Sequence, residues 1–308
     1  MKITAAAIQM PSVPLDVAGN CERADALLRQ AHDQGTDLAV LPEMFNTGYG
    51  WGHDFDPIAE DADGPTVRLL RERAAQWKMT IAAGFVEQDG HHLYDSLGLF
   101  TPDGKIAVYR KRHLVFWERF KFLPGRQPVI ARTPFGRIGF AVCADMIYRR
   151  TWDDYRDRVD LAVISSAWPE FAHQQNGRKH WLFGHIGHLS GEIPCKVGRD
   201  LNIPVIFSNQ SGQTRTTIPM LGTWVMEKIK DRFAGLSSVC DGNHGGPVRA
   251  GVEEQVVVSG ITIHSPRGPK SCHSMYPSDQ KARSSVSAPS GSASPPSGFT
   301  GATVADAQ

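Results

Sequence analysis

The 308-residue sequence has almost no net charge, because 33 Lys and Arg residues stand against 32 Asp and Glu residues. A chain with a formal charge of +1 has no overall field that would draw it to nucleic acid or to an anionic membrane. Long hydrophobic runs are also missing, and every apolar stretch is shorter than the roughly 18 residues expected of a transmembrane helix. The N-terminal apolar run over residues 5–8 is too short for a signal peptide. We therefore expect neither nucleic acid nor a membrane among the partners.

Cysteine is scarce and follows no pairing pattern. The five residues are an odd number, they are widely separated, and no Cys-Xaa-Xaa-Cys pair occurs among Cys21, Cys143, Cys195, Cys240 and Cys272. This predicts neither a disulfide framework nor a zinc knuckle, and it favours a reducing, cytoplasmic setting. With 41% hydrophobic and 21% charged residues, the composition is otherwise typical of a globular protein with a substantial core.

The chain changes composition near residue 265. Residues 1–264 alternate short apolar runs, helical patterns and turn residues, whereas residues 265–308 are dominated by Ser, Pro, Gly and Ala. A segment with so little to bury does not offset the entropy of ordering it, so we predict a disordered C-terminal tail. The folded part is expected to be one domain over residues 1–264.

Apolar runs and helical periodicity predict an α/β protein with a mixed sheet layered by helices. Residues 20–34 and 66–78 carry apolar positions at helical spacing, and Gly35 ends the first of these helices. Several apolar runs are continuous, as expected for strands covered on both faces, and hairpins are expected around Gly90 and Gly104. The predicted strands are residues 3–9, 38–41, 80–85, 96–100, 107–110, 137–142, 161–165, 205–208, 237–240 and 254–263.

Three residues with reactive side chains, Glu43, Lys111 and Cys143, each come at or directly after the end of a predicted strand. Singly, each has an ordinary explanation: a loop carboxylate, one of three basic residues on a solvated surface, and a small core residue. Side chains alternate along a strand, however, so Arg110 and Lys111 point to opposite faces, and one of them must face the layered interior. A buried lysine needs a partner or a task, which makes this stretch a candidate for function.

Taken in the order Glu, Lys, Cys, these stretches resemble the carbon–nitrogen hydrolase family, also called the nitrilase superfamily. The resemblance covers about residues 3–264. It rests on short motifs, which are Ala7-Ile8-Gln9, Asp16-Val17 to Asn20, Leu41-Pro42-Glu43 with Thr47-Gly48-Tyr49, the segment from Tyr109 to Leu114, and the turn at Cys143. The resemblance implies a single-domain, four-layer α-β-β-α sandwich with an amide- or nitrile-cleaving site. It also implies that Glu43 is the general base, that Lys111 stabilises the oxyanion and that Cys143 is the nucleophile.

A second glutamate usually follows the lysine motif in this family and precedes a Pro-Gly pair. Residues 117–125 have that shape, so Glu118 resembles the second glutamate; the alternative is a surface partner of Arg119 or Lys121.

The chemistry of a cysteine fits these implied roles. A free thiol has a pKa of about 8.5, so a neighbouring carboxylate is needed to take its proton during attack, and Lys111 is expected to favour the thiolate. The backbone N–H of Ala144 is a candidate second donor to the oxyanion. Attack on an amide carbonyl gives a thioester, and Glu43 then activates the water that hydrolyses it. No metal or organic cofactor is needed.

The residues around the nucleophile bear on the substrate. The amidase and carbamoylase branches of the family usually have an acidic residue two positions after the cysteine, where this chain has Asp145, whereas nitrilases tend to have Cys-Trp-Glu, which it lacks. A small amide or N-carbamoyl substrate is therefore favoured, with release of ammonia or an amine, and a nitrile is the close alternative. Asp95 stands where Asn is common in the family and is taken as a minor change.

Aromatic side chains near these motifs are candidates for the substrate pocket. Tyr49, Trp117 and Trp168 lie within a few residues of them, and aromatic walls usually accompany a partly apolar ligand. Ala144 and Asn209 complete the residues expected to touch substrate, Asn209 because its segment matches the family's Asn-Xaa-Xaa-Gly pattern. Since family members are often dimers or larger, a homo-oligomer is expected.

Residues 170–200 depart most from the family pattern and supply a rival hypothesis. His185, His188 and Glu192 fall on one helical face, with His180 one turn upstream, and such a set can bind zinc. The usual hydrolytic motif His-Glu-Xaa-Xaa-His is absent, and Pro194 is expected to end the helix early. A metal-dependent hydrolase is therefore the second alternative, and a non-catalytic binding protein on the same fold is the third.

Overall fold

Two six-stranded sheets of similar construction form the centre of the protein. A computed structural model describes residues 1–50, 52–170, 186–219 and 226–264. In each sheet three neighbouring parallel strands are flanked by antiparallel ones. The first sheet, in spatial order, contains β14 (Gln255–Thr262), β1 (Lys2–Gln9), β2 (Leu38–Val40), β3 (Thr80–Asp89), β4 (His92–Phe100) and β5 (Ile106–Arg110). The second contains β13 (Val248–Arg249), β12 (Ser238–Cys240), β9 (Val205–Asn209), β8 (Leu161–Ser166), β7 (Gly136–Val142) and β6 (Ile130–Thr133).

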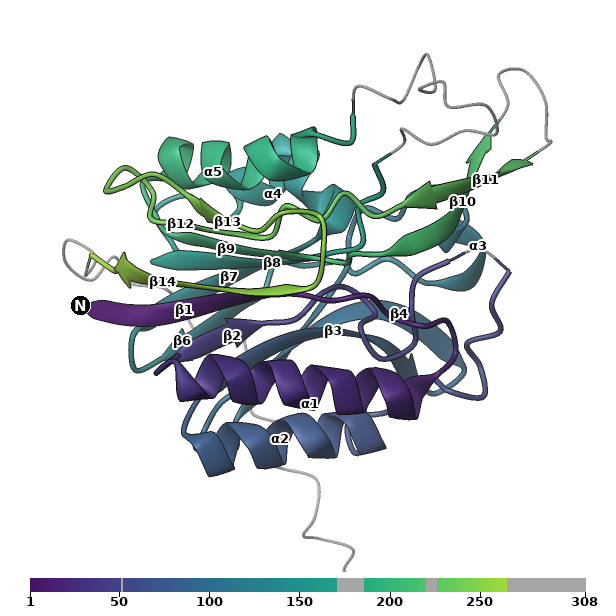
Figure 1. Ribbon diagram of the computed structural model, residues 1–308, viewed down its shortest axis with the longest axis horizontal. Coiled ribbons are helices and arrows are strands. Elements are labelled where there is room, and N and C mark those ends of the chain that lie inside the picture. The colour runs from purple at the N-terminus through teal and green to yellow at the C-terminus, as the bar shows by residue number, and fades with distance from the viewer. Residues whose placement is uncertain (51, 171–185, 220–225, 265–308) are drawn as a thin grey trace, which may run out of the picture. The chain divides into compact units, whose positions relative to one another are not determined.

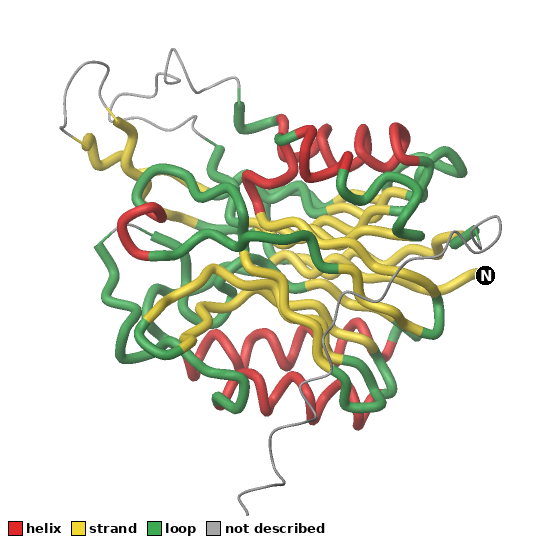
Figure 2. Tube along the Cα trace, turned by 180° about the vertical axis from the view of Figure 1, so that it is seen from behind, coloured by secondary structure: helices red, strands yellow, loops and turns green. Residues whose placement is uncertain are grey.

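The sheets face each other and helices cover their outer faces, so the layers run α-β-β-α (Figure 1). The longer helices α1 (Val17–Asp33) and α2 (Pro65–Trp77) lie along the first sheet, and α4 (Arg149–Asp153) and α5 (Leu189–Leu201) lie along the second. Seen from behind, the strands remain between two helical layers (Figure 2). The described residues form a single domain, as the family resemblance implies.

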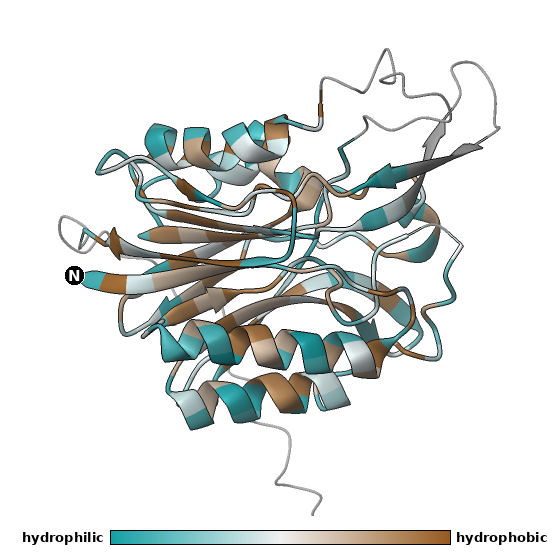
Figure 3. Cartoon of the chain, viewed as in Figure 1, coloured by the Kyte–Doolittle hydropathy of each residue, from teal (hydrophilic) through white to brown (hydrophobic). Residues whose placement is uncertain are grey.

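Alternation along β1 explains why its middle, residues 5–8, is apolar at every position. Ile3, Ala5 and Ala7 belong to the core between the sheets, whereas Ala6 and Ile8 pack with the helices on the outer face. Both faces are therefore apolar in this stretch. The colouring by hydropathy shows mainly brown and white strands between helices that carry both teal and brown residues (Figure 3). The burial of both strand faces is the physical reason for the continuous apolar runs in the sequence.

The predicted elements agree with the structure except at short or polar strands. All ten predicted strands and both predicted helices are present, with the hairpins at Gly90 and Gly104. Strands that the sequence did not indicate are β6, β13 and the two-stranded ribbon β10 (Gln213–Pro219) and β11 (Met226–Arg232). These are very short or rich in polar residues, so they lack the apolar run by which a buried strand is recognised.

Two expectations about the second half of the chain are wrong. Pro194 does not end a helix, because it lies inside α5, which continues to Leu201. The cysteines are not all unpaired, because Cys195 on α5 forms a disulfide with Cys240 at the end of β12, with Cα atoms 5.4 Å apart. Spacing in the sequence does not reveal such a pair, since it depends on which elements pack together. The cysteine pattern therefore no longer supports a reducing setting.

Further expectations concern the C-terminal tail, membrane-spanning helices and the cellular location. The predicted tail, residues 265–308, lies outside the described residues and stays a prediction. Within the described residues, no helix is long and apolar enough to cross a membrane. A cytoplasmic location also stays a prediction.

Candidate active site

Four of the predicted site residues converge where strands of both sheets end. Glu43 follows β2, Lys111 follows β5, and Cys143 follows β7 at the start of the short 3₁₀ helix η1 (Cys143–Ile147). Glu118 begins the short helix α3 (Glu118–Lys121). Glu43, Lys111 and Glu118 are completely buried, and 4% of Cys143 is exposed. Polar groups are costly to bury without partners, so their hydrogen bonds define the site.

Glu43 is fixed at both oxygens. Its Oε1 lies 2.6 Å from Nζ of Lys111, and its Oε2 accepts a hydrogen bond of 2.6 Å from the backbone N–H of Ala167. The side-chain amide of Gln210 donates to the backbone carbonyl of Glu43 at 2.7 Å. A Cβ atom on Gly84 of β3 would come within 2.6 Å of the Glu43 Cα atom, so only glycine leaves room for the Glu43 backbone here.

Lys111 lies among three carboxyl groups. Its Nζ is 2.6 Å from Glu43, 2.7 Å from Glu118 and 3.1 Å from Asp95 on β4. Burial alone would lower the pKa of Lys111, but the nearby charges of Glu118, Glu43 and Asp95 outweigh burial and raise the pKa well above its ordinary value. The side chain therefore stays an ammonium ion. Its neighbour Arg110 pairs instead with Glu87 near the surface, so the alternation expected of this strand is confirmed.

Glu118 is an internal residue and not a surface partner of Arg119 or Lys121. One oxygen accepts a hydrogen bond of 2.7 Å from the Tyr49 hydroxyl, and the other accepts one of 2.9 Å from the backbone N–H of Val115. Burial raises the pKa of Glu118, although Lys111 opposes the rise. The Pro-Gly pair downstream fixes the lysine segment, because Gly125 donates to the Lys111 carbonyl at 2.8 Å.

Cys143 has a backbone conformation that is rare for a residue with a side chain. Its φ angle is +46°, in the left-handed region, and residues held there often lie at functional sites. Burial raises the pKa of its thiol well above the ordinary value, the charge of Glu43 adds to the rise, and Lys111 only partly opposes it. Lys111 thus favours the thiolate, as expected, but burial and the charge of Glu43 outweigh this effect and keep the pKa of the thiol raised.

Asp145 ties the cysteine turn to the lysine segment. One of its oxygens accepts hydrogen bonds from the backbone N–H of Val142 at 3.1 Å and the hydroxyl of Tyr109 at 2.7 Å. The other accepts from the backbone N–H of His113 at 2.9 Å and lies 2.7 Å from the His113 ring. The sequence suggested Asp145 only as a marker of substrate class, whereas its contacts give it a structural role in the site.

Four of the five predicted substrate contacts form two pairs around these residues, and the fifth, Ala144, follows the nucleophile. Tyr49 and Trp117 lie together beside Glu118, with ring centroids 5.1 Å apart. Trp168 follows β8, and its backbone N–H donates to the Asn209 side chain at 2.7 Å. The Asn209 amide also donates to the Gly235 carbonyl at 2.9 Å, so this side chain is engaged with the backbone. Ala144 is buried beside the nucleophile in η1. Contact with substrate stays a prediction for all of them.

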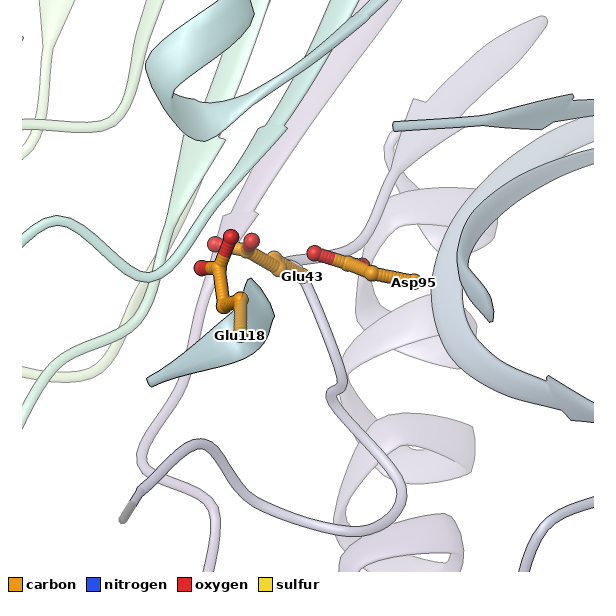
Figure 4. A group of neighbouring side chains, drawn as sticks. All are labelled: Glu43, Asp95 and Glu118. Carbon is orange, nitrogen blue, oxygen red and sulfur yellow. The ribbon is translucent and has the colours of Figure 1, made fainter. Parts of the chain in front are cut away.

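Asp95 is the site residue that the sequence undervalued. It was taken as a minor change, yet it is completely buried, and its carboxyl group converges with those of Glu43 and Glu118 (Figure 4). The available signal was an acidic residue in the middle of a strand whose other positions are mostly apolar.

The three carboxyl groups have the separation of metal ligands, with oxygen atoms from Glu43, Asp95 and Glu118 all within 4.8 Å of one another. The Lys111 ammonium group, however, already supplies a positive charge at 2.6 to 3.1 Å from each of them. This arrangement fits a buried ion-pair cluster better than a cation site.

The rival metal site of the sequence falls largely outside the described residues. His180 and His185 are not among them, so the set cannot be assembled. His188 and Glu192 are exposed, His188 directly before α5 and Glu192 in its first turn.

Comparison with known proteins agrees with the fold and with the family resemblance. The sequence model of the family described as Carbon-nitrogen hydrolase matches residues 4–184, which include all four central site residues. The omega-amidase of Danio rerio is 30% identical over 175 residues, or 53% of this chain and 62% of that protein. The nitrilase of Pyrococcus abyssi is 33% identical over 150 residues, or 47% of this chain and 57% of that protein. The matched stretches thus span about three fifths of these relatives.

Solved structures share the architecture over most of the chain. A CN-hydrolase superfamily protein from Xanthomonas campestris superposes with a TM-score of 0.69 at 25% identity, covering 85% of this chain and 91% of that one. An amidase from Nesterenkonia superposes with a TM-score of 0.66 at 21% identity, covering 84% and 90%.

Two facing sheets that bring a buried Glu, Lys and Cys together from the ends of three strands define a nitrilase-type α/β sandwich. With the family match extending over more than half of its length, the chain belongs to the carbon–nitrogen hydrolase family.

Proposed function

We propose that this protein is a thiol hydrolase that cleaves a non-peptide C–N bond of a small amide or N-carbamoyl compound and releases ammonia or an amine. The observation that carries the proposal is the cluster of Glu43, Lys111 and Glu118 beside the buried thiol of Cys143. A buried thiol with a raised pKa has little thiolate to offer, so attack requires a base that removes the proton as the C–S bond forms.

Glu43 is that base in the proposed mechanism. Its carboxylate takes the Cys143 proton while the sulfur attacks the carbonyl carbon, and the carbonyl electron pair moves to the oxygen. The ammonium group of Lys111 and the backbone N–H of Ala144 stabilise the resulting oxyanion. Because Lys111 is held by three carboxyl groups, its charge is already oriented before substrate binds.

Collapse of the tetrahedral intermediate breaks the C–N bond. Protonated Glu43 returns its proton to the leaving nitrogen, which departs as ammonia or an amine and leaves a thioester on Cys143. Glu43 then takes a proton from water, whose oxygen attacks the thioester carbon. As the C–S bond breaks and the acid is released, Glu43 gives this proton to the sulfur, which restores the thiol and the carboxylate. Glu118 holds Lys111 and Tyr49 in place throughout. Each proton transfer is balanced by these side chains alone.

An amide or carbamoyl substrate is favoured by Asp145, which stands two residues after the nucleophile. A nitrile is the alternative, and the matched relatives carry both names, omega-amidase and nitrilase. In the cell we expect a cytoplasmic homodimer or larger homo-oligomer.

A substrate panel tests the proposal. Purified protein is incubated with primary amides, N-carbamoyl compounds and nitriles, and ammonia and the acid product are measured. Release from amides or carbamoyl compounds, and loss of it in a folded Cys143→Ala variant, is the expected result. Turnover by Cys143→Ala at the wild-type rate would contradict the thioester route, and turnover of nitriles alone would establish the alternative. Loss of activity with a chelator, while Cys143→Ala stays active, would point to the metal-dependent hydrolase.

A further inference from the structure

Asp95 contacts Lys111, but the mechanism above gives its carboxyl group no defined protonation state and no contact with the base Glu43. It lies on β4, completely buried, and its backbone carbonyl accepts a hydrogen bond of 2.8 Å from the Lys111 backbone N–H. Its Oδ2 atom is 3.1 Å from Nζ of Lys111. The carboxyl group of Asp95 points toward Glu43, and oxygen atoms of the two groups lie within 4.8 Å of each other (Figure 4).

The charges of this cluster do not balance if every acid is ionised. Glu43, Asp95 and Glu118 would carry three negative charges against the single positive charge of Lys111, and all four side chains have no exposed surface. An uncompensated buried charge is strongly unfavourable, and a buried carboxyl group next to another commonly keeps its proton. One of the three acids is therefore expected to be neutral.

The hydrogen bonds single out Asp95 as the neutral acid. Glu43 accepts from Lys111 and from the Ala167 N–H, and Glu118 accepts from Lys111, Tyr49 and the Val115 N–H. Neither oxygen of Asp95 accepts a well-aligned hydrogen bond from the described residues.

Burial and the charge of Glu43 raise the pKa of Asp95 well above its ordinary value, and Lys111 opposes them only in part. The titratable groups around Asp95 and Lys111 are Glu43 after β2, Glu118 on α3, Cys143 on η1 and Tyr49.

We propose that Asp95 is a positioning residue that works as a neutral carboxylic acid, donating its proton to Glu43 and accepting a hydrogen bond from Lys111. This inference rests on the proposed function, since it concerns how the base and the oxyanion donor are held. The O–H group orients the Glu43 carboxylate, and the C=O group helps to orient the ammonium ion. Keeping Asp95 neutral also gives the cluster of Glu43, Glu118, Asp95 and Lys111 a net charge of −1 instead of −2. The smaller negative charge makes removal of the Cys143 proton less unfavourable.

Asparagine is the matched substitution, because its amide has the same shape, donates and accepts at the same places, and does not ionise. Asp95→Asn is compared with Asp95→Ala, and with Asp103→Asn, an exposed carboxylate in the turn that follows β4. We expect Asp95→Asn to keep kcat within about tenfold of wild type and Asp95→Ala to lower kcat by roughly 100-fold, with KM little changed, because misplaced catalytic groups cost about that much. Thermal melts establish that each variant is folded.

Infrared difference spectra of the substrate-free protein at neutral pH test the proton directly. Wild type minus Asp95→Asn should show the C=O stretch of a protonated carboxylic acid, and wild type minus Asp103→Asn should show only an ionised carboxylate. An ionised band for Asp95 would overturn the inference, as would a folded Asp95→Asn variant no more active than Asp95→Ala. If Asp95→Ala does not fold, Asp95→Ser takes its place. Because the spectra need no substrate, they separate failure of this inference from failure of the proposed function.

Discussion

The carboxylate of Asp145, two residues after Cys143, accepts a hydrogen bond of 2.9 Å from the backbone N–H of His113, two residues after Lys111. This contact joins the turn after β7, a strand of the second sheet, to the segment after β5, a strand of the first sheet. One buried side chain thus fixes the segments that carry Cys143 and Lys111 relative to each other. Asp145 therefore contributes both to the fold and to the geometry of the site.

Asp145→Asn should lower both the stability of the fold and the activity of the site. The amide nitrogen of asparagine replaces one carboxylate oxygen and accepts no hydrogen bond. If it replaces Oδ2, Tyr109 and Val142 lose their acceptor, and if it replaces Oδ1, His113 loses its acceptor. Leaving buried donors unpaired costs about 1–3 kcal/mol of unfolding free energy, which urea denaturation measures. We expect kcat/KM to fall by roughly 100-fold through misplacement of the reacting groups. A folded variant with wild-type stability and activity would remove this role.

Lys111→Ala should abolish most of the activity and lower stability. Loss of an oxyanion donor costs about 3–4 kcal/mol in the transition state, or roughly 100- to 1000-fold in kcat. Removing one partner of a buried ion pair also costs about 3–5 kcal/mol of unfolding free energy. The matched control is Arg110→Ala, the adjacent and partly exposed cation that pairs with Glu87. Equal effects of the two substitutions on kcat would contradict a special place for Lys111.

The pH dependence of alkylation should report the thiol state of Cys143. Its pKa is raised above the ordinary value, so the reactive thiolate is scarce at neutral pH and grows as pH rises through and beyond the range of a free thiol. The rate of inactivation by iodoacetamide should therefore keep increasing into the alkaline range, measured with intact mass to localise the label. A rate already on a plateau at neutral pH would mean that the resting group is a thiolate.

The disulfide between Cys195 and Cys240 should stabilise the domain without serving the reaction. The two residues are 45 positions apart, and loss of a native disulfide typically costs about 2–4 kcal/mol. A Cys195→Ser and Cys240→Ser double variant should unfold at lower urea concentration and keep wild-type kcat/KM. Reductant should lower the stability of wild type and leave that of the double variant unchanged. Equal stability of the two proteins, with or without reductant, would show that the bond is absent in solution.

The sequence alone was sufficient to predict the features that depend on neighbouring residues in the chain. Continuous apolar runs marked buried strands, and alternation along the strand before Lys111 showed that one basic residue had to point inward. Glu43, Lys111 and Cys143 could be found because each comes at or directly after the end of a predicted strand and within a short motif.

Residues whose importance depends on distant neighbours could not be found in the same way. Asp95 matters because its carboxyl group lies 3.1 Å from Nζ of Lys111, and Cys195 matters because it forms a disulfide with Cys240. The thiol state of Cys143 likewise depends on burial and on the balance of Glu43 against Lys111. Strand ends and motifs follow from local hydrophobic patterning, which the sequence alone carries. Protonation and pairing depend on distances and desolvation, and those exist only once the two sheets have packed together.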